Sequence, residues 1–517
     1  MPTAKALTPR APVHILGDGD FTSANGVVSG TGTLTDPYII EGWDISAATR
    51  HGIWIEYTTA HFIVRNCYVH EGAPLYHGVY LYKTYNGRVE NVESSWNLWG
   101  VGLYVCGSEG YGNTVAGCYA HENWWSGILI ANSSDCKAIG NTVSRNSGYG
   151  IYLGICEYCE ASGNTAIRNN YGVYLSTSHW CTLSDNTADN NNGRGVSLYH
   201  GYNCTVSGNM ANNNPYGVYM STCEDCAVDG NSAMNNSDVG IFFTNVANSV
   251  FTSNIAKKNL GYGVNLLGDL STGNYLDGNV ADDNGDDGFY TTGFDNDFTG
   301  NTANNNNDHG IFLFSSSNNI LSGNTANNNY YGIYLSSSSN DNTLTANTVN
   351  NNGYNGIFLD GSTGNTLAGN TANNNDACGI NLHSSSNDNT LTSNTSNNNN
   401  LDGILCWSFL NNNTLIANSA KNNEMHGIVL SGSSDCILTG NTANNNSNQG
   451  IYIDGSNDNT LSSNTANNNY YGIYLYSSSN NNVVSNACYD NSDYDINNSG
   501  TGNIFQYNSY GTSYGVP

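Results

Sequence analysis

The chain has 517 residues, and its 41 acidic residues outnumber its 13 basic ones, so its formal net charge at pH 7 is −28. This charge argues against nucleic acid as the partner, because no basic stripe is present to offset repulsion from the phosphates. No apolar run reaches the roughly 18 residues that a membrane-spanning helix needs. We therefore expect a protein that does not span a membrane.

A five-residue phrase, Gly-[Ile/Val]-x-[Leu/Ile]-x, recurs along nearly the whole chain at intervals of 22 to 26 residues. We call it the Gly phrase. A recurrence at so regular an interval means that one structural unit repeats and that each copy packs against its neighbours. The copies, some of them loose, begin at Gly52, Gly78, Gly102, Gly127, Gly150, Gly172, Gly195, Gly217, Gly240, Gly263, Gly288, Gly310, Gly332, Gly356, Gly379, Gly403, Gly427, Gly450 and Gly472.

Each repeat is too short and too polar for a helix. In the copy that begins at Gly332, the alternation predicts that Ile333 and Leu335 point to one side of a strand and Tyr334 to the other. Ser, Asn, Gly and Asp bound these strands and favour turns. No stretch has a 3.6-residue period, which argues against a leucine-rich repeat. The sequence therefore predicts an all-β fold, a single-stranded parallel β-helix of about 20 turns.

The two ends of the chain depart from the repeat. The open ends of a parallel β-helix expose unpaired strand edges, so we expect them to be capped. The predicted organisation is an N-terminal cap and entry strand at residues 1–40, the β-helix repeats at residues 41–496, and a C-terminal cap at residues 497–517.

One Asn follows the second strand of each repeat, as in Asn319-Ile-Leu-Ser-Gly-Asn324. A sharp turn there favours a residue that tolerates positive φ, and the side-chain amide can bond to the same amide in the next turn. We expect an internal Asn ladder made of Asn141, Asn164, Asn186, Asn209, Asn231, Asn254, Asn279, Asn301, Asn324, Asn347, Asn370, Asn394, Asn418, Asn441, Asn464 and Asn486.

Residues 30–44, with the sequence GTGTLTDPYIIEGWD, and the Gly phrases that follow resemble the NosD-like family of β-helix repeat proteins. The resemblance covers about residues 14 to 505. It implies a right-handed helix with the pectin-lyase-like fold and an archaeal cell-surface protein. It also implies copper binding by association with the family, although no Met-rich or His-rich cluster identifies a ligand. Fold likeness alone says little about activity.

The resemblance and the surface rich in Asn, Ser, Thr and Tyr favour a secreted or cell-surface protein. No signal peptide precedes the predicted first cap. We interpret the start at Met1 as a chain that lacks its leader.

The early repeats hold the best candidate for a catalytic site, because most basic residues and most Trp residues lie there. Two His-Glu pairs recur two repeats apart, His70-Glu71 and His121-Glu122. A polysaccharide lyase or epimerase needs a base for the α-proton, a role for His70 or His121, and a cation for the substrate carboxylate, a role for Arg65 or Arg88. The alternative is that both pairs are turn residues that recur because the repeats recur.

Five cysteines occupy one inward position of successive repeats: Cys136, Cys159, Cys181, Cys204 and Cys226. Three interpretations stay open: a column of small buried thiols, disulfides between turns, and a soft-metal site. Two CxxC pairs, at residues 156–159 and 223–226, lie three repeats apart and are too far from each other to share one zinc ion.

Acidic residues gather at Asp282, Asp283, Asp286, Asp287, Asp295 and Asp297. They are interpreted as solvated turns, as a weak Ca²⁺ site formed by the first four, or as a pair for hydrolysis. We predict no required cofactor, with Ca or Cu as the candidate ions.

The outward position of the Gly phrase is often aromatic. We expect Tyr152, Tyr174, Tyr219, Tyr334, Tyr452 and Tyr474 to form an exposed aromatic face that binds sugar rings or another copy of the chain. The alternative is ring stacking that only stabilises the strands. The leading hypothesis is a non-catalytic extracellular protein that binds glycan or self-associates. The alternatives are a polysaccharide lyase or epimerase and a NosD-like copper-binding protein.

Overall fold

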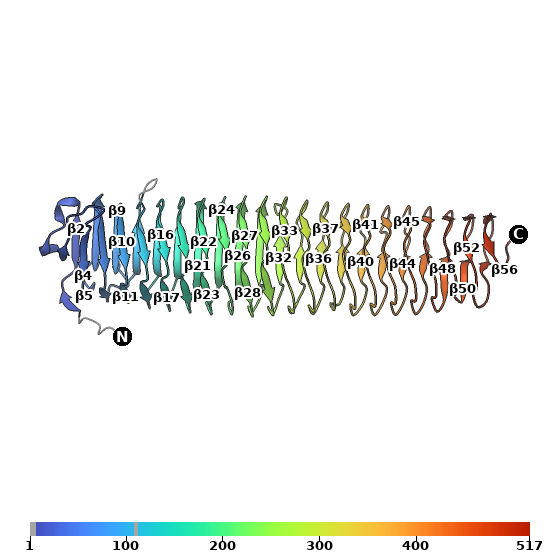
Figure 1. Ribbon diagram of the computed structural model, residues 1–517, viewed down its shortest axis with the longest axis horizontal. Coiled ribbons are helices and arrows are strands. Elements are labelled where there is room, and N and C mark those ends of the chain that lie inside the picture. The colour runs from blue at the N-terminus through green and yellow to red at the C-terminus, as the bar shows by residue number, and fades with distance from the viewer. Residues whose placement is uncertain (1–6, 108–111) are drawn as a thin grey trace. The chain divides into compact units, whose positions relative to one another are not determined.

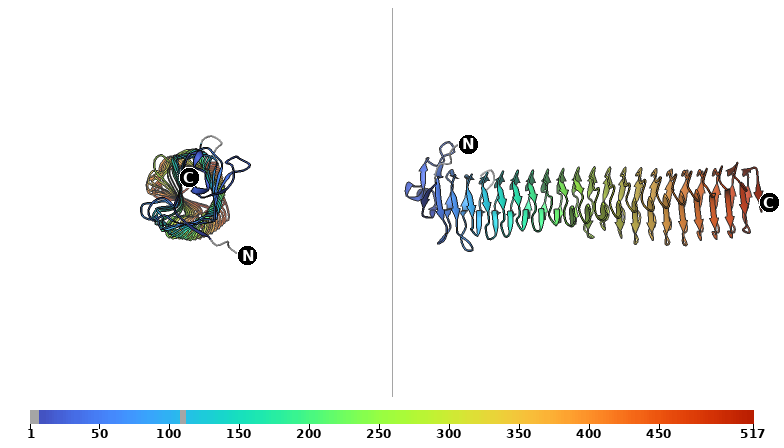
Figure 2. Two further views of the ribbon diagram at one scale, coloured as in Figure 1. Left: turned by 90° about the vertical axis from the view of Figure 1, so that its left-hand side faces the viewer. Right: turned by 90° about the horizontal axis from the view of Figure 1, so that it is seen from below.

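The computed structural model describes residues 7–107 and 112–517, which divide into two compact units, unit 1 up to Asn259 and unit 2 from Leu260 onward. In each unit the chain coils as a right-handed parallel β-helix, with about 20 turns in all (Figure 1). The predicted fold class is confirmed. Figure 2 shows the stacked turns from two other directions. The helices among the described residues are two short 3-10 helices, η1 (Asp18–Asp20) and η2 (Ser23–Asn25), and none is long and apolar enough to cross a bilayer.

Three sheets run along unit 1. The Gly sheet, built from the Gly phrases, contains β2 (Val13–Leu16), β6 (Ile53–Thr58), β9 (Val79–Thr84), β12 (Trp99–Tyr104), β15 (Ser126–Ala131), β18 (Tyr149–Gly154), β21 (Tyr171–His179), β24 (Arg194–Tyr202), β26 (Tyr216–Glu224) and β29 (Ile241–Ala247). The Asn sheet, which leads to the predicted Asn ladder, contains β3 (Val27–Ser29), β4 (Tyr38–Glu41), β7 (Phe62–Arg65), β10 (Gly87–Glu90), β13 (Thr114–Ala116), β16 (Lys137–Ile139), β19 (Glu160–Ser162), β22 (Thr182–Ser184), β25 (Thr205–Ser207), β27 (Ala227–Asp229) and β30 (Val250–Thr252). The third sheet contains β1 (Thr8–Arg10), β5 (Trp43–Ser46), β8 (Tyr68–His70), β11 (Glu93–Ser95), β14 (Tyr119–His121), β17 (Thr142–Ser144), β20 (Thr165–Ile167), β23 (Thr187–Asp189), β28 (Ser232–Met234) and β31 (Ile255–Lys257).

Unit 2 repeats this plan with a thinner third sheet. Its Gly sheet contains β32 (Val264–Leu267), β34 (Phe289–Thr291), β36 (Ile311–Phe314), β38 (Ile333–Ser336), β40 (Ile357–Asp360), β42 (Ile380–His383), β44 (Ile404–Trp407), β46 (Ile428–Ser431), β48 (Gln449–Asp454), β50 (Tyr471–Tyr476), β53 (Ile496–Asn498) and β56 (Ser513–Tyr514). Its Asn sheet contains β33 (Tyr275–Asp277), β35 (Asp297–Thr299), β37 (Ile320–Ser322), β39 (Thr343–Thr345), β41 (Thr366–Ala368), β43 (Thr390–Thr392), β45 (Thr414–Ile416), β47 (Ile437–Thr439), β49 (Thr460–Ser462), β51 (Asn482–Val484) and β54 (Ile504–Gln506). The third sheet is reduced to single-residue bridges such as Thr325 to Thr348, and to β52 (Ala487–Cys488) and β55 (Ser509–Tyr510).

The alternation predicted from the sequence builds the core. In β38, Ile333 and Leu335 are fully buried, whereas Tyr334 faces outward and is half-buried. Successive turns lie in parallel register, as Leu344 of β39 does with Leu321 below it and Leu367 above it. Stacked aliphatic side chains fill the interior, because each side chain gains its burial from the turns on either side.

The segments predicted as caps contain strands. β1, β2 and β4 pair in parallel with β5, β6 and β7, while β3 pairs antiparallel with β4. At the other end, β54 and β56 pair in parallel with β51 and β53. The boundaries at residues 40 and 497 stay a prediction.

The predicted Asn ladder is present, with one correction to its backbone. Asn141 Nδ2 donates to Asn164 Oδ1 at 2.9 Å, and the same bond links later members such as Asn324 and Asn347 at 3.0 Å. The positive φ, however, belongs to the residue before each ladder Asn, for example Gly323 at 63°. That residue points outward at the corner, and the ladder Asn itself must point its amide into the core.

Two further ladders line the other corners. One contains the Asn five residues after each predicted ladder residue, as in the bond from Asn352 Nδ2 to Asn375 Oδ1 at 3.0 Å. The other lies five residues before it and links Asn319 Nδ2 to Asn342 Oδ1 at 3.1 Å. A corner lined by such a ladder therefore satisfies its buried backbone groups with side-chain amides, which removes the cost of leaving them unpaired.

Candidate functional site

The first His-Glu pair lies on the third sheet of unit 1. His70 Nε2 is 3.0 Å from Asp44 Oδ1, and its Nδ1 is 3.5 Å from Glu71 Oε2. The Tyr68 ring stacks on the imidazole with a centroid distance of 4.5 Å. The imidazole is therefore held by two carboxylates and a tyrosine ring. These contacts favour a role in stabilising the turn over a role as a catalytic base.

The second pair repeats this arrangement. His121 Nε2 is 3.2 Å from Glu93 Oε1, and its Nδ1 is 3.3 Å from Glu122 Oε2. The Tyr119 ring stacks on it at 4.3 Å. A general base needs a ring nitrogen that can reach the substrate proton, and here both nitrogens face carboxylates. The catalytic role of either histidine stays a prediction.

The predicted cations are already paired with acidic side chains. Arg65 Nε lies 2.6 Å from Glu41 Oε2, and Arg88 Nε lies 2.5 Å from Glu90 Oε2. Glu90 Oε1 is also 4.0 Å from Arg65 Nη1, so the four groups form a balanced chain of charges. Arg65 and Arg88 belong to the Asn sheet, whereas the two histidines belong to the third sheet. The structure thus does not bring the proposed base and clamp together on one face.

The six predicted tyrosines all lie on the outward face of a Gly sheet and are half-buried: Tyr152, Tyr174 and Tyr219 in unit 1, and Tyr334, Tyr452 and Tyr474 in unit 2.

Their rings stack between neighbouring turns. Tyr152 and Tyr174 lie 5.7 Å apart with an angle of 13° between the ring planes, and Tyr334 lies 5.1 Å from Phe358 at 11°. Rings stacked in this way cover each other's faces and turn their edges to solvent. We call the column of outward-facing aromatic residues along the Gly sheet the aromatic file. A sugar ring needs an exposed aromatic face to stack on, and most rings of the file cover each other's faces, so most of the file is suited to stabilising the sheet. Exposed ring faces are expected only where the aromatic file is interrupted.

Unit 2 contains such an interruption. After Phe358 the outward positions in register are Asn381, Leu405 and Val429, and aromatic residues resume at Tyr452. A groove with a volume of about 330 Å³ lies at this break. We call it the file-break groove. Its lining residues are Asp402, Leu405, Trp407, Met425, His426, Val429, Ser431, Tyr452 and Asp454.

The groove has an apolar floor between aromatic and polar walls. The Trp407 side chain is 45% exposed, and its ring contacts the His383 ring on one side at 4.7 Å. The Tyr452 ring contacts Tyr474 on the neighbouring turn at 5.6 Å. The register places the smaller Val429 on the opposite side of Tyr452, toward the groove. The hydrophobic floor and the two rings together form a surface suited to the apolar face of a ligand.

Two carboxylates stand at the edges of the groove. Asp402 Oδ1 accepts a hydrogen bond from the His426 backbone N–H at 3.0 Å, and Asp454 Oδ2 accepts one from Ser431 Oγ at 3.4 Å. Asp402 is 8% exposed, and this burial raises the pKa of its carboxyl to about 6.

This buried carboxyl gives a pH prediction. Between the ordinary Asp pKa of 3.8 and about 6, the folded protein keeps a proton that the unfolded chain has released, so stability falls as pH rises through this window. In the Asp402→Asn variant, the free energy of unfolding should fall by about 3 kcal/mol less than in the wild type as pH rises through this window, because Asn does not titrate. Asn can still accept the backbone bond, as Asn355 Oδ1 does from Cys378 N at 3.0 Å in the corresponding position.

Urea unfolding at pH 4 and pH 7 checks this expectation. The variant should gain stability over the wild type at pH 7 but not at pH 4. Asp388→Asn, at an exposed turn, is the matched control. Equal pH dependence in the wild type and Asp402→Asn would contradict the expectation.

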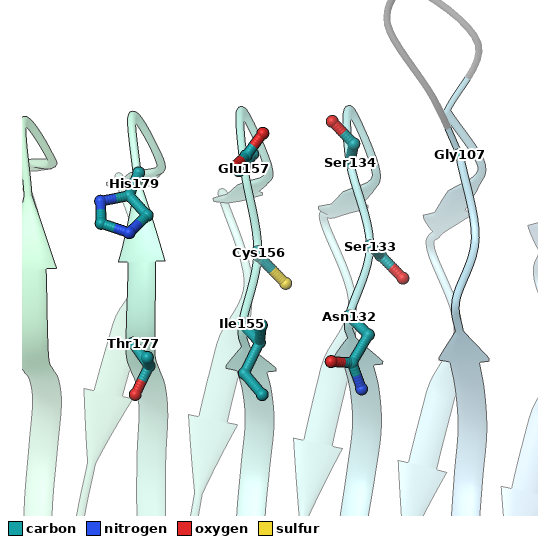
Figure 3. A pocket seen from close by; sticks show the side chains of 9 residues that line it. All are labelled: Gly107, Asn132, Ser133, Ser134, Ile155, Cys156, Glu157, Thr177 and His179. Atoms are coloured by element: carbon teal, nitrogen blue, oxygen red, sulfur yellow. The ribbon is translucent and has the colours of Figure 1, made fainter.

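A larger pocket, of about 450 Å³, lies at a corner of unit 1 (Figure 3). Glu157 and His179 lie on neighbouring turns at one end of it, and Cys156 lies deeper, 1% exposed. The described residues that line it include Asn132, Ile155 and other non-aromatic side chains. Among the described residues that line it there is no Trp or Tyr, so it offers polar contacts and one imidazole but no large ring for a sugar to stack on.

All fourteen cysteines are free and buried. The predicted column is present, and Cys159 N donates to Cys181 Sγ at 3.3 Å. It occupies the corner where unit 2 carries an Asn ladder. Burial raises the pKa of the Cys106 thiol to about 11 and that of Cys118 to about 12, so both are protonated at neutral pH. In this structure the column consists of small buried thiols.

The predicted acidic candidates separate in the structure. Asp282 Oδ1 accepts from Asn304 N at 2.8 Å on one corner, and Asp283 is exposed beside it. Asp286 and Asp287 lie at the next corner, before the Gly sheet. Among the described residues these four do not form a common ligand group, although Asp287 joins a different one. Asp297 Oδ1 accepts from Thr299 Oγ1 at 2.6 Å, and Asp295 is exposed.

Comparison with solved structures finds similar chains, all at low identity. A variant of the periplasmic alginate epimerase AlgG is 15% identical, with 70% of this chain and 85% of that chain covered and a TM-score of 0.34. The A-module of the Azotobacter vinelandii mannuronan C-5 epimerase is 15% identical, covering 76% and 88% at a TM-score of 0.29. A tailspike protein of an Escherichia coli bacteriophage is 13% identical, covering 51% and 39% at a TM-score of 0.35. The likeness concerns the fold alone.

Two protein-family models match parts of the chain. The model of the periplasmic copper-binding protein NosD matches residues 154–275. No curated protein matches the sequence. The model described as right handed beta helix region matches residues 73–211, 269–396 and 383–511, which is more than half of the chain. The chain therefore belongs to the right-handed β-helix family.

Proposed function

We propose that this protein is a non-catalytic, extracellular β-helix that binds a polysaccharide in the file-break groove of unit 2. The observation that carries the proposal is the interruption of the aromatic file, where Leu405 and Val429 replace rings between Phe358 and Tyr452. Three turns at about 4.8 Å each span roughly 14 Å, which leaves room for more than one sugar ring.

The chemistry of the groove suits a neutral sugar. Pyranose rings have apolar faces that stack on Trp and Tyr and hydroxyl groups that donate to carboxylates. Trp407 and Tyr452 supply the rings, and Asp402 and Asp454 supply the acceptors. A polyuronate is disfavoured, because the groove is acidic and the net charge of the chain is −28.

The proposal includes a location outside the cytoplasm. It is supported by the match to a family of periplasmic proteins and by the likeness to a periplasmic epimerase. Self-association through the aromatic face is the other form of this hypothesis. It is less favoured because the stacked rings expose their edges.

Binding to soluble neutral glucans, mannans and xylans, measured by affinity electrophoresis and then calorimetry, tests the proposal. Trp407→Ala and Tyr452→Ala should each weaken binding by about 5- to 150-fold, because each removes an aromatic contact worth on the order of 1–3 kcal/mol. Tyr354→Ala, at an exposed tyrosine of unit 2 outside the groove, should bind like the wild type. The proposal fails if no polysaccharide binds or if both groove variants retain full affinity.

Copper binding is a second candidate, favoured by the family-model match at residues 154–275. That segment contains the buried thiols Cys156, Cys159, Cys181, Cys204, Cys223 and Cys226. Soft thiolates suit Cu(I), although burial opposes their ionisation. Copper uptake by the purified chain separates this candidate from the first.

A further inference from the structure

Three side chains of unit 2 converge at the corner before the Gly sheet. The ligand atoms of Asp287, Asp308 and His309 all lie within 4.8 Å of one another. Asp287 Oδ1 accepts a hydrogen bond from the His309 backbone N–H at 2.8 Å, which fixes its carboxylate against the next turn. Asp308 precedes His309, so two neighbouring turns contribute to the cluster.

The histidine of this cluster is buried and has an unsatisfied ring nitrogen. His309 is 7% exposed, and its Nδ1 makes no hydrogen bond to any described residue. That atom lies 3.0 Å from Asp308 Oδ1, in poor geometry for a hydrogen bond. A buried polar atom without a partner costs free energy, and an ion bound to the nitrogen would remove that cost.

The side chains of the cluster suit a cation. Asp287 is 2% exposed, and its carboxylate and that of Asp308 place oxygen atoms beside the imidazole nitrogen. Carboxylate and imidazole are both common ligands of divalent transition metal ions.

We propose that Asp287, Asp308 and His309 bind a divalent first-row transition metal ion, with zinc as the representative ion. The nitrogen ligand disfavours Ca²⁺ and Mg²⁺, which prefer oxygen. Carboxylate oxygen and imidazole nitrogen are both zinc ligands, and three protein ligands are the number in open zinc sites, which keep a position for water or another ligand. The Asp308 side chain is 50% exposed, so the site is accessible from solvent.

The same corner of a later turn provides an internal comparison. Asp402 Oδ1 accepts from His426 N at 3.0 Å, as Asp287 does from His309. There, however, Met425 occupies the position of Asp308. The Nδ1 of His426 is also satisfied, because it accepts from Gln449 N at 3.2 Å. The third ligand and the unsatisfied nitrogen therefore occur together at the first corner, and both are missing at the second.

A bound ion would join two turns of the Gly sheet beside the aromatic file. The His309 ring lies 5.1 Å from Phe312 and 4.9 Å from Tyr331. We expect metal binding to stabilise the folded protein, because the unfolded chain does not hold these ligands together.

Titration of the full chain, first stripped with a chelator, with Co²⁺ and Zn²⁺ tests the proposal. The wild type should bind one equivalent with visible Co²⁺ bands, and Zn²⁺ should displace the Co²⁺ and raise the thermal unfolding midpoint. Asp308→Asn and His309→Gln should weaken binding at least thirtyfold. Asp295→Asn, at an exposed acidic residue of the same unit, should bind like the wild type.

Circular dichroism in the presence of chelator establishes that each variant is folded, and the half-exposed Asp308 is the safer of the two sites to change. The proposal would be overturned if the wild type bound neither Co²⁺ nor Zn²⁺, or if Asp308→Asn and His309→Gln bound the ions as tightly as the wild type. Displacement of Co²⁺ by equimolar Ca²⁺ would overturn it as well. Thiolate charge-transfer bands would place the ion on cysteines and would also overturn it.

Discussion

Replacing Asn347 by Ala is expected to destabilise the protein by about 4 kcal/mol. Asn347 is 1% exposed, and its Oδ1 accepts from both the backbone N and the Nδ2 of Asn324, at 2.9 and 3.0 Å. Its Nδ2 donates to Leu321 O at 2.8 Å and to Asn370 Oδ1 at 2.9 Å. Alanine would remove the acceptor of the buried Asn324 backbone N–H and the side-chain donor to Leu321 O, and it would also leave a cavity.

The midpoint of urea unfolding measures this loss. Thr345→Ala is the matched control, because Thr345 lies two residues earlier on the outward face of β39 and is partly exposed. It should change stability by less than about 0.5 kcal/mol. If the two variants unfold at the same urea concentration, the ladder contributes little and the corners are held by the backbone alone.

The sequence predicted the architecture well because a repeat multiplies a weak signal. One alternation of Ile333, Tyr334 and Leu335 is ambiguous, but many copies in phase leave only one inward face. The same repetition contained two ladders that were missed. Asn319, Asn324 and Asn329 are spaced five residues apart, and each belongs to a different corner. The spacing was visible in the sequence, whereas the side that each Asn faces depends on three separate turns.

The backbone at the corner was predicted wrongly, for a physical reason. Asn tolerates positive φ, and the ladder Asn follows a strand, so the two properties were combined in one residue. A side chain that must reach its copy in the next turn points inward, and the left-handed residue beside it points outward. Gly323 or Ala346 therefore takes the positive φ.

The candidate sites were less predictable, because a site depends on exceptions to the repeat. The groove arises where three successive Gly phrases carry Asn381, Leu405 and Val429 instead of an aromatic residue. That absence is visible in the sequence, but it acquires meaning only once the register is known. Likewise, Asp287 meets Asp308 and His309 because one turn here takes 22 residues.

Gly332→Ala is expected to destabilise the protein by about 3 kcal/mol or more. A Cβ at residue 332 would lie 2.6 Å from Gly356 O and 2.8 Å from both Asn352 Nδ2 and Val349 Cβ. Gly356 O and the Asn352 amide cannot move away from this Cβ without weakening hydrogen bonds. Gly356 O accepts from Ile333 N at 2.9 Å, and the Asn352 amide is bonded to Asn375 in the ladder.

Gly353→Ala tests whether this cost comes from the close approach of two turns. Gly353 lies in the same unit, and a Cβ there would meet only Asn329 O at 3.7 Å, an ordinary contact. This variant should be neutral or slightly stabilising, since Ala reduces the entropy of the unfolded chain. Urea unfolding of both variants provides the comparison. If Gly332→Ala is as stable as Gly353→Ala, glycine does not recur because the turns exclude a side chain. If only Gly332→Ala is destabilised, the spacing of the turns explains why every Gly phrase begins with glycine.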